Sequence, residues 1–214
     1  SSLIQTANDV TFKFSQSGGY NIVKNGGFKN GLSGWVEARY QPNGTNMSVS
    51  VLSDSNEWVL DGTYALVMRS TNNTSGEYRV DSQNFKVKKY TNYTLSYWVA
   101  AHRVTEIGHY IRGNELNILD SRRYCPKTGG KNRSDWTRIT HTFNTGDNHQ
   151  ISINFIHFIT GNDAYSWITD VMINEGEVAL PWSPHPSEIY EGLTAIDANG
   201  VTIYNGALTI KNKS

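Results

Sequence analysis

Acidic side chains are the first candidates for chemistry in this sequence, because a glycosidase needs a pair of them. One carboxyl group serves as the acid and the other as base or nucleophile, about 5–10 Å apart across a cleft. The acidic residues that could serve are Asp61, Glu106, Glu115 and Asp120. None of them belongs to a recognisable catalytic motif. The sequence therefore favours solvated carboxylates in loops and turns.

Cys125 is the second candidate, as a nucleophile. It follows Arg122 and Arg123 and precedes Lys127, and these positive charges would favour the thiolate. No motif supplies an orienting histidine, so an exposed and idle cysteine is the simpler interpretation. Because this is the single cysteine of the chain, an intramolecular disulfide framework is excluded.

Aromatic side chains next to polar ones are the third candidate, and they suit a sugar ligand. A sugar ring has an apolar face that stacks on an aromatic ring, and hydroxyl groups that pair with polar side chains. In the segment 93–102, Tyr93, Leu95, Tyr97 and Val99 alternate with Thr94, Ser96, Trp98, Ala100 and His102. The first set predicts a core face and the second a wetter face. Trp98 on the wetter face could stack on a sugar or pack under a loop.

Composition and periodicity predict the elements that must hold these residues. The chain has 6 Trp, 12 Tyr and 19 Gly among 214 residues, with 18% charged residues, as suits an all-β protein with many turns. We expect strands in the ranges 47–51, 64–69, 78–87, 93–102, 107–119, 136–143, 150–160 and 167–174. We expect a long loop over 121–135 and no helix. Short strands at this spacing favour a sandwich or barrel.

Four segments, in order, resemble a known family. Asn25–Phe28 with Asn30–Trp35, then Asp61–Leu66, Tyr93–Trp98 and Trp167–Val171 are similar to carbohydrate-binding modules of the family 4/9/22-like type. The resemblance covers residues 21–184. It implies a jelly-roll β-sandwich of two antiparallel sheets that binds a glycan and breaks no bond.

The same resemblance implies that the ligand lies on a concave sheet and its adjoining loops. Carried over by position, the ligand-binding residues are Trp98, His102, His109, Tyr110, Arg112, Tyr78, Arg79 and Trp58, with Asn154, Ile156 or His157 from the penultimate strand. Some of these have a structural alternative. Tyr110 could belong to the core, and His157 shares a face with Ile153 and Phe155, so it is buried unless a bulge turns it.

A calcium site is also implied by the resemblance, as a structural feature between the first turn and the last strand. Asp170 matches the last-strand carboxylate of such a site. Lys29 stands where the template has an acidic residue, and its charge would repel the cation. Asp170 therefore either binds Ca²⁺ or accepts hydrogen bonds from turn amides.

Both ends of the chain resemble segments of phage tail, baseplate and minor structural proteins. We expect a connector over residues 1–20, the sandwich over 21–184, and a C-terminal β-meander over 185–214. The expected setting is a virion, outside the cell, with bacterial surface polysaccharide, other tail subunits and a homotrimer as partners. A net charge of zero argues against nucleic acid as a partner. The sequence contains no run of 18 apolar residues, which argues against membrane insertion. The alternatives are a glycan-cleaving enzyme and a structural spacer.

Overall fold

The structure is a computed structural model that describes residues 19–38, 46–53, 58–60, 62–71, 76–126, 133–159, 163–189, 194–197 and 200–203. Nearly all of the connector expected at residues 1–20 lies outside these ranges. So do Asp61, residues 127–132 of the basic loop, and the last eleven residues of the expected meander.

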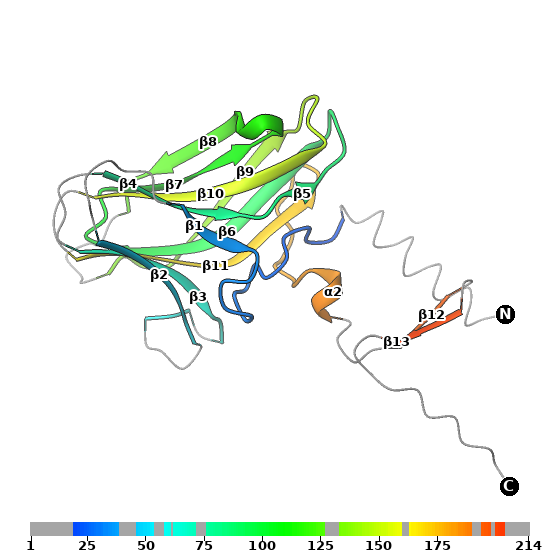
Figure 1. Cartoon of the computed structure of the whole chain (residues 1–214), viewed down its shortest axis with the longest axis horizontal. Coiled ribbons are helices and arrows are strands. Elements are labelled where there is room, and N and C mark those ends of the chain that lie inside the picture. The colour runs from blue at the N-terminus through cyan, green and yellow to red at the C-terminus, as the bar shows by residue number, and fades with distance from the viewer. Residues whose placement is uncertain are drawn as a thin grey trace, which may run out of the picture.

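Two antiparallel sheets form the body of the protein (Figure 1). Sheet I has the order β1 (Trp35–Ala38), β4 (Gly76–Ser82), β10 (Gln150–Ile159), β7 (Glu106–Arg112), β8 (Ile118–Tyr124), and β5 (Phe85–Lys86) also pairs with β10. Sheet II has the order β2 (Asn46–Leu52), β3 (Ala65–Thr71), β11 (Ala164–Glu175), β6 (Asn92–His102), β9 (Thr137–Asn144). The predicted all-β sandwich of two antiparallel sheets is confirmed.

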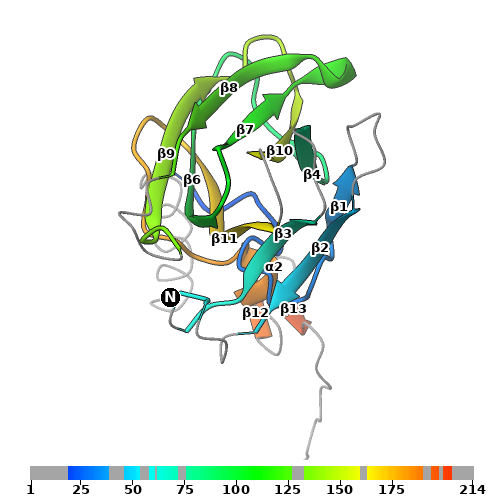
Figure 2. The ribbon, with the colours of Figure 1, turned by 90° about the vertical axis from the view of Figure 1, so that its left-hand side faces the viewer.

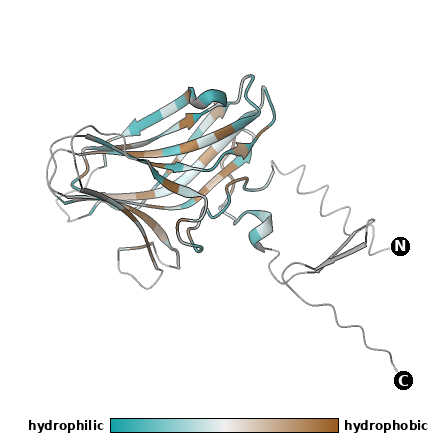
Figure 3. Ribbon diagram, in the orientation of Figure 1, coloured by the Kyte–Doolittle hydropathy of each residue, from teal (hydrophilic) through white to brown (hydrophobic). Residues whose placement is uncertain are grey.

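The core lies between the two sheets, where alternate side chains of each strand meet. Phe155 of β10 and Ile111 of β7 come from sheet I, while Leu95, Tyr97 and Ile168 come from sheet II, and none is more than 1% exposed. Brown, white and teal bands follow one another along the strands in Figure 3, which shows that apolar and polar residues are interspersed in them. Because side chains alternate along a strand, the remaining residues lie on the two outer faces.

Edge strand β8 differs from the prediction. Residues 121–124 were expected to begin a long loop, but they complete β8, which pairs with β7 from Ile107↔Tyr124 to Arg112↔Ile118. Its side chains are exposed or half-buried, so the segment has no apolar alternation for the sequence to show. Backbone hydrogen bonds to β7 make it a strand.

Short helices and a hairpin complete the described chain. The 3-10 helix η1 (Asn114–Leu116) and helix α2 (Pro186–Ile189) were not predicted, while β12 (Thr194–Asp197) and β13 (Gly200–Ile203) pair as a hairpin within the expected meander. In the described part of the chain, neither helix has the length and apolar character needed to cross a bilayer.

Asn21 joins the start of the sandwich to its end. Its Nδ2 donates to the carbonyl oxygens of Val171, at 3.1 Å, and Ser183, at 2.9 Å. Its Oδ1 accepts from the backbone N–H groups of Val23 and Ile173. The side chain is fully buried, so these four bonds satisfy its amide. The loop from residue 19 to 34 and the segment from 176 to 189 therefore lie together against β11, as Figure 1 shows.

Candidate functional site

Polar side chains cover the outer face of sheet I, and the strand register arranges them in rows. One row runs Val36, Asp81, Asn154, Tyr110, Ser121 across β1, β4, β10, β7 and β8. The next runs Ala38, Arg79, Ile156, Gly108, Arg123. In Figure 2 these strands follow one another around one side of the sandwich. Arg79, Tyr110, Arg112 and Asn154, all expected to contact ligand, are brought together here.

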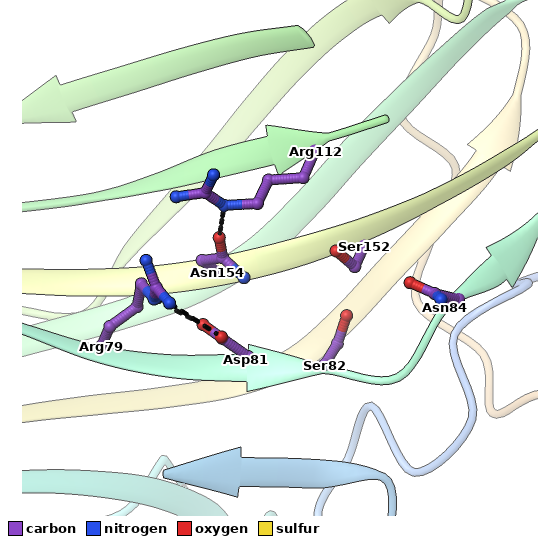
Figure 4. Close-up of a pocket in the computed structure, with 7 residues that line it drawn as sticks. All are labelled: Arg79, Asp81, Ser82, Asn84, Arg112, Ser152 and Asn154. Atoms are coloured by element: carbon purple, nitrogen blue, oxygen red, sulfur yellow. Dashed lines mark hydrogen bonds and ion pairs between the residues drawn. The ribbon is translucent and has the colours of Figure 1, made fainter. Parts of the chain in front are cut away.

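A polar cavity of about 150 Å³ opens on this face (Figure 4). Its charged residues are Arg79, Asp81 and Arg112, and its neutral ones are Ser82, Asn84, Ser152 and Asn154. The guanidinium of Arg79 holds Asp81 at two points, 2.9 Å from Nε to Oδ1 and 3.2 Å from Nη2 to Oδ2. The Nε of Arg112 donates to Oδ1 of Asn154. These contacts fix the side chains that a ligand would meet.

Burial and Arg79 have opposite effects on the pKa of Asp81. Desolvation raises the pKa of its carboxyl above the ordinary value, and the neighbouring Arg79 acts against this rise. The contact with Arg79 therefore offsets part of the solvation that burial removes.

Tyr110 lies next to the cavity residue Asn154 in the strand register, and its hydroxyl both donates and accepts a hydrogen bond. The hydroxyl donates to Oε2 of Glu77, at 3.1 Å, and accepts from Nη2 of Arg123. The guanidinium carbons of Arg112 and Arg123 lie 5.5 and 5.6 Å from the ring centroid. Because the residue is only 8% exposed, it offers a sugar an edge framed by guanidinium groups and no open aromatic plate.

Two carboxylates, Glu77 and Glu106, lie on the same face, on either side of Phe158 in the register. Two strand spacings separate their backbones, about 10 Å. Arg123 lies between them, 4.0 Å from Glu77 and 3.8 Å from Glu106, and its guanidinium sits 4.5 Å from the ring centroid of Phe158. The guanidinium of Arg123 thus lies between the two carboxylates, in the space where a catalytic pair would have to hold the glycosidic bond.

Tyr78, His109 and His157 lie in the core and cannot contact a ligand as placed. Their exposed fractions are 2%, 0% and 0%. The expectation that they share a ligand-binding surface with Arg112 is not met, because alternation turns them toward sheet II. His157 is buried as its face with Ile153 and Phe155 predicted, and no bulge turns it outward.

Hydroxyl groups satisfy both nitrogens of His157, while His109 has one hydroxyl partner and the imidazole of His141 as the other. Nδ1 of His157 lies 2.8 Å from Oγ of Ser166, and Nδ1 of His109 lies 2.9 Å from the hydroxyl of Tyr97. Burial lowers the pKa of each histidine to about 3, with the charge of His141 adding to the effect at His109. Both are neutral at physiological pH.

Trp98 and His102 lie on the outer face of sheet II, not beside Tyr110, because β6 pairs with β11 and β9. Trp98 is half-buried between Thr169 and Arg138 in the register, and His102 is opposite Tyr165. The sequence assigned them to the correct side of their strand but to the wrong sheet.

Trp58 is on the outer side of sheet II as well. Its ring stacks on Trp167, with centroids 5.8 Å apart, and Trp167 stacks on Tyr165 at 5.6 Å. Arg133 and Arg69 lie over the Trp58 and Tyr165 ends of this stack. Trp167 covers one face of the Trp58 ring, while 37% of the Trp58 surface stays exposed.

Asp170 does not fit the calcium site. It lies in β11 at a register shift between Thr169 and Met172, with a positive φ of 53°. Burial raises the pKa of its carboxyl, and the charge nearby is that of Arg138. Among the residues that the structure describes, no three Asp, Glu, His or Cys side chains gather as ligands. The surroundings of Asp170 therefore do not suit a divalent cation.

The sequence interpretation missed Asp81, Ser82, Asn84 and Ser152, which complete the cavity. Asp81 follows Arg79 by two residues, so the two share a face of β4, and this was a usable signal. Its position opposite Asn154 depends on the pairing of β4 with β10, about seventy residues apart in sequence.

The two antiparallel sheets form the β-sandwich that the sequence motifs implied for a carbohydrate-binding module. The family model described as "Carbohydrate binding domain" matches residues 20–162, and the chain belongs to this family. The resemblance drawn from the sequence motifs is thus confirmed.

Solved structures share the fold. One is the enzymatically active domain of tailspike protein 4 of Bacteriophage CBA120, with a TM-score of 0.53 and 16% identity over 73% of this chain and 21% of that one. Another is the module TmCBM61 in complex with β-1,4-galactotriose, with a TM-score of 0.51 and 18% identity over 73% of this chain and 99% of that one.

Curated relatives are much longer than this chain. A tail fiber protein of Enterococcus phage phiEF24C is 47% identical over 45 residues, which are 21% of this chain and 2% of that protein. The tRNA nuclease WapA of Bacillus subtilis strain 168 is 25% identical over 203 residues, 89% of this chain and 8% of the nuclease. The chain spans less than a tenth of either relative. The resemblance to phage tail proteins is supported by the first match.

Proposed function

We propose that this chain is a non-catalytic carbohydrate-binding domain of a phage tail protein, and that it attaches to bacterial surface polysaccharide. The ligand lies on the outer face of sheet I. The observation that carries this proposal is the polar cavity beside Tyr110. Arginine, serine and asparagine side chains converge there, and they are the groups that pair with sugar hydroxyls.

Similarity to phage proteins supports the setting in a tail. The 45-residue match to a tail fiber protein and the shared fold of a tailspike domain both point to it. We place the domain in the virion, facing the host surface. Attachment through single sites of this kind is weak. Several copies in a trimeric fibre would raise the overall avidity. Analytical ultracentrifugation of the protein, which measures its mass in solution, tests whether it forms a trimer.

Two observations favour an enzymatic role: the pair Glu77 and Glu106, and the fold shared with a tailspike domain that is described as enzymatically active. The guanidinium of Arg123 lies between these two carboxylates, where the glycosidic bond would have to be held, so we do not assign bond cleavage to the pair. Incubating the protein with surface polysaccharide and measuring new reducing ends tests this choice. A time-dependent rise that Glu106→Gln abolishes would replace the binding function with hydrolysis.

The binding face is tested by comparing Arg112→Ala with Arg69→Ala. Both changes remove an arginine from an outer face, but Arg112 borders the cavity and Arg69 lies on sheet II. We expect Arg112→Ala to weaken binding to host envelope polysaccharide about tenfold, because a charge-assisted contact is lost. Arg69→Ala should bind as the parent does. The reverse pattern would move the site to sheet II, and no effect of either change would favour a spacer.

A further inference from the structure

Tyr90, in the loop between β5 and β6, presents an open aromatic ring. Its side chain is 72% exposed, the highest value among the large hydrophobic residues in the described part of the chain. The outer face of sheet I offers no such ring, since Tyr110 is only 8% exposed. A pyranose stacks on an aromatic ring through its C–H face, so an accessible ring is the first requirement of a stacking site.

The backbone of Tyr90 is in the left-handed region, with a φ of 51°. Glycine adopts this conformation without strain, whereas a bulky aromatic residue does so at a cost in free energy. Because most of the ring is in water, its burial offsets little of that cost. Strained residues of this kind gather at ligand-binding sites, so the outlier points to a role for Tyr90 beyond folding.

Hydrogen bonds fix the ring at both ends of the residue. The backbone N–H of Tyr90 donates to the carbonyl oxygen of Gly146, at 2.6 Å, and the hydroxyl donates to Oδ1 of Asp147, at 3.3 Å. One residue farther along, the N–H of Thr91 donates to Oγ1 of Thr145, at 3.0 Å. The loop before β6 and the loop after β9 are thus joined, and the ring is preorganised for a ligand.

Polar groups lie at the hydroxyl edge of the ring, within reach of the hydroxyls of a stacked sugar. Nζ of Lys89 donates to Oδ1 of Asp147, at 2.8 Å, the same oxygen atom that Tyr90 contacts. In the described part of the chain no hydrogen bond reaches Oδ2 of Asp147, which can therefore accept from a sugar hydroxyl. The hydrogen bond from Lys89 lowers the pKa of Asp147, so this acceptor is ionised at neutral pH.

We propose that Tyr90, Lys89 and Asp147 form a second glycan-binding site, in which a pyranose stacks on the ring and its hydroxyl groups pair with the ammonium and the carboxylate. The class of ligand rests on the proposed function. The site itself is separate, because none of the three residues lines the cavity on sheet I. A polysaccharide long enough to reach both sites would bind more tightly than an oligosaccharide that occupies one.

NMR titration of the ¹⁵N-labelled protein locates the site. The probe is a set of oligosaccharides released from host envelope polysaccharide by partial acid hydrolysis. We expect the amide signals of Tyr90 and Gly146 to shift as the probe is added. The signal of Asn154, in the cavity on sheet I, should shift with a separate dissociation constant.

Two replacements of Tyr90 separate binding from folding. Tyr90→Gly removes the ring and relieves the positive φ, so this variant should be about as stable as the parent, while the dissociation constant read from Gly146 rises about tenfold. Tyr90→Phe keeps the ring and should keep most of the binding. Trp58→Ala removes another exposed ring, on the outer side of sheet II, and as the control it should leave the Gly146 titration unchanged.

The outcomes distinguish the two sites. Shifts at Asn154 alone would overturn the second site and uphold the proposed function, while shifts at Tyr90 and Gly146 alone would do the opposite for the face on sheet I. Shifts at none of these positions would overturn both. A Gly146 titration that Tyr90→Gly does not weaken would also overturn the second site. Tyr90 shifts that follow protein concentration without sugar would assign the ring to contact between copies of the chain instead.

Discussion

Nε2 of His109 lies 2.7 Å from Nδ1 of His141, and this hydrogen bond joins β7 of sheet I to β9 of sheet II. It belongs to a chain of contacts that runs from the core to the surface. The hydroxyl of Tyr97 is 2.9 Å from Nδ1 of His109, and Nε2 of His141 is 3.3 Å from Oδ2 of Asp120. With both imidazoles neutral, each member donates to the next, from Tyr97 to the carboxylate.

Acid should destabilise the fold through the buried histidines. The pKa of His109 and of His157 is lowered to about 3 by burial, whereas an unfolded histidine has a pKa near 6.5. Between these values the unfolded chain binds more protons, so stability is complete above about pH 6.5 and falls as the pH falls toward 3. We expect each histidine to remove on the order of 2 kcal/mol at pH 5.

Urea unfolding at pH 7.5 and pH 5 measures this loss. A His157→Gln variant, which keeps a hydrogen-bonding side chain, should show a smaller difference between the two pH values than the parent. Equal free energies of unfolding at both pH values in the parent would contradict the neutral state of these histidines.

Replacing Gly26 by alanine should strongly destabilise the protein. A Cβ at this position would lie 2.0 Å from the carbonyl oxygen of Val171, a backbone atom that cannot move away easily. We expect a loss of about 3 kcal/mol or more in the free energy of unfolding. Gly31→Ala is the control, because nothing lies within 4 Å of its Cβ and only its φ of +60° is strained. That change should cost about 1 kcal/mol. Thermal denaturation of the two variants compares them directly, and equal losses would argue against the close approach of Gly26 to β11.

Asn21→Ala tests the link between the first loop and the end of the sandwich. The change leaves two carbonyl groups and two N–H groups without their partner in a buried site, which should cost about 3 kcal/mol. Asn144→Ala, at an exposed position with two hydrogen bonds, should cost under 1 kcal/mol. Chemical denaturation of both gives the comparison, and a neutral Asn21→Ala variant would rule out the link.

Trp58→Ala should leave glycan binding unchanged, although the side chain is a large exposed aromatic ring. It lies on the sheet II side, stacked on Trp167, so its loss should lower stability by about 1–2 kcal/mol and nothing more. Binding to envelope polysaccharide and urea unfolding, measured on the same variant, separate the two effects. Loss of binding without loss of stability would show that the sugar contacts this stack.

The sequence shows how side chains alternate along each strand, but it does not show which strands pair. This difference explains how much of the fold could be predicted. Alternation placed Tyr97 in the core and Trp98 on the other side of the same strand, and both placements are correct. Alternation also indicates that His109 points into the core, because Ile107 and Ile111 lie on the same face of the strand, but this prediction was not made. Alternation does not tell which sheet a strand joins. Trp98 was therefore grouped with Tyr110, from which the structure separates it by the thickness of the sandwich.

The candidate site was predicted in part for the same reason. Arg79, Tyr110 and Arg112 were named from the family resemblance, and the structure brings them to one face. Asp81 and Ser152 were missed, since their place in the cavity depends on the pairing of β10 with β4 and β7. Strand β8 was taken for a loop because an exposed edge strand carries no apolar pattern.

Asn21 and Ser183 also bear on how the domain responds to pulling. Force applied to the chain before residue 20 and after residue 188 acts on the contacts between these two segments, which include the Tyr20–His185 ring contact and the hydrogen bonds from Asn25 to Glu188 and from Asn21 to Ser183. While these contacts and the neighbouring hydrogen bonds to β11 hold, the force is not transmitted through the two sheets. The outer face of sheet I, where we propose that the glycan binds, then keeps its shape. Such an arrangement would let a tail protein stay bound to a moving cell, because the pulling force would not distort its binding face.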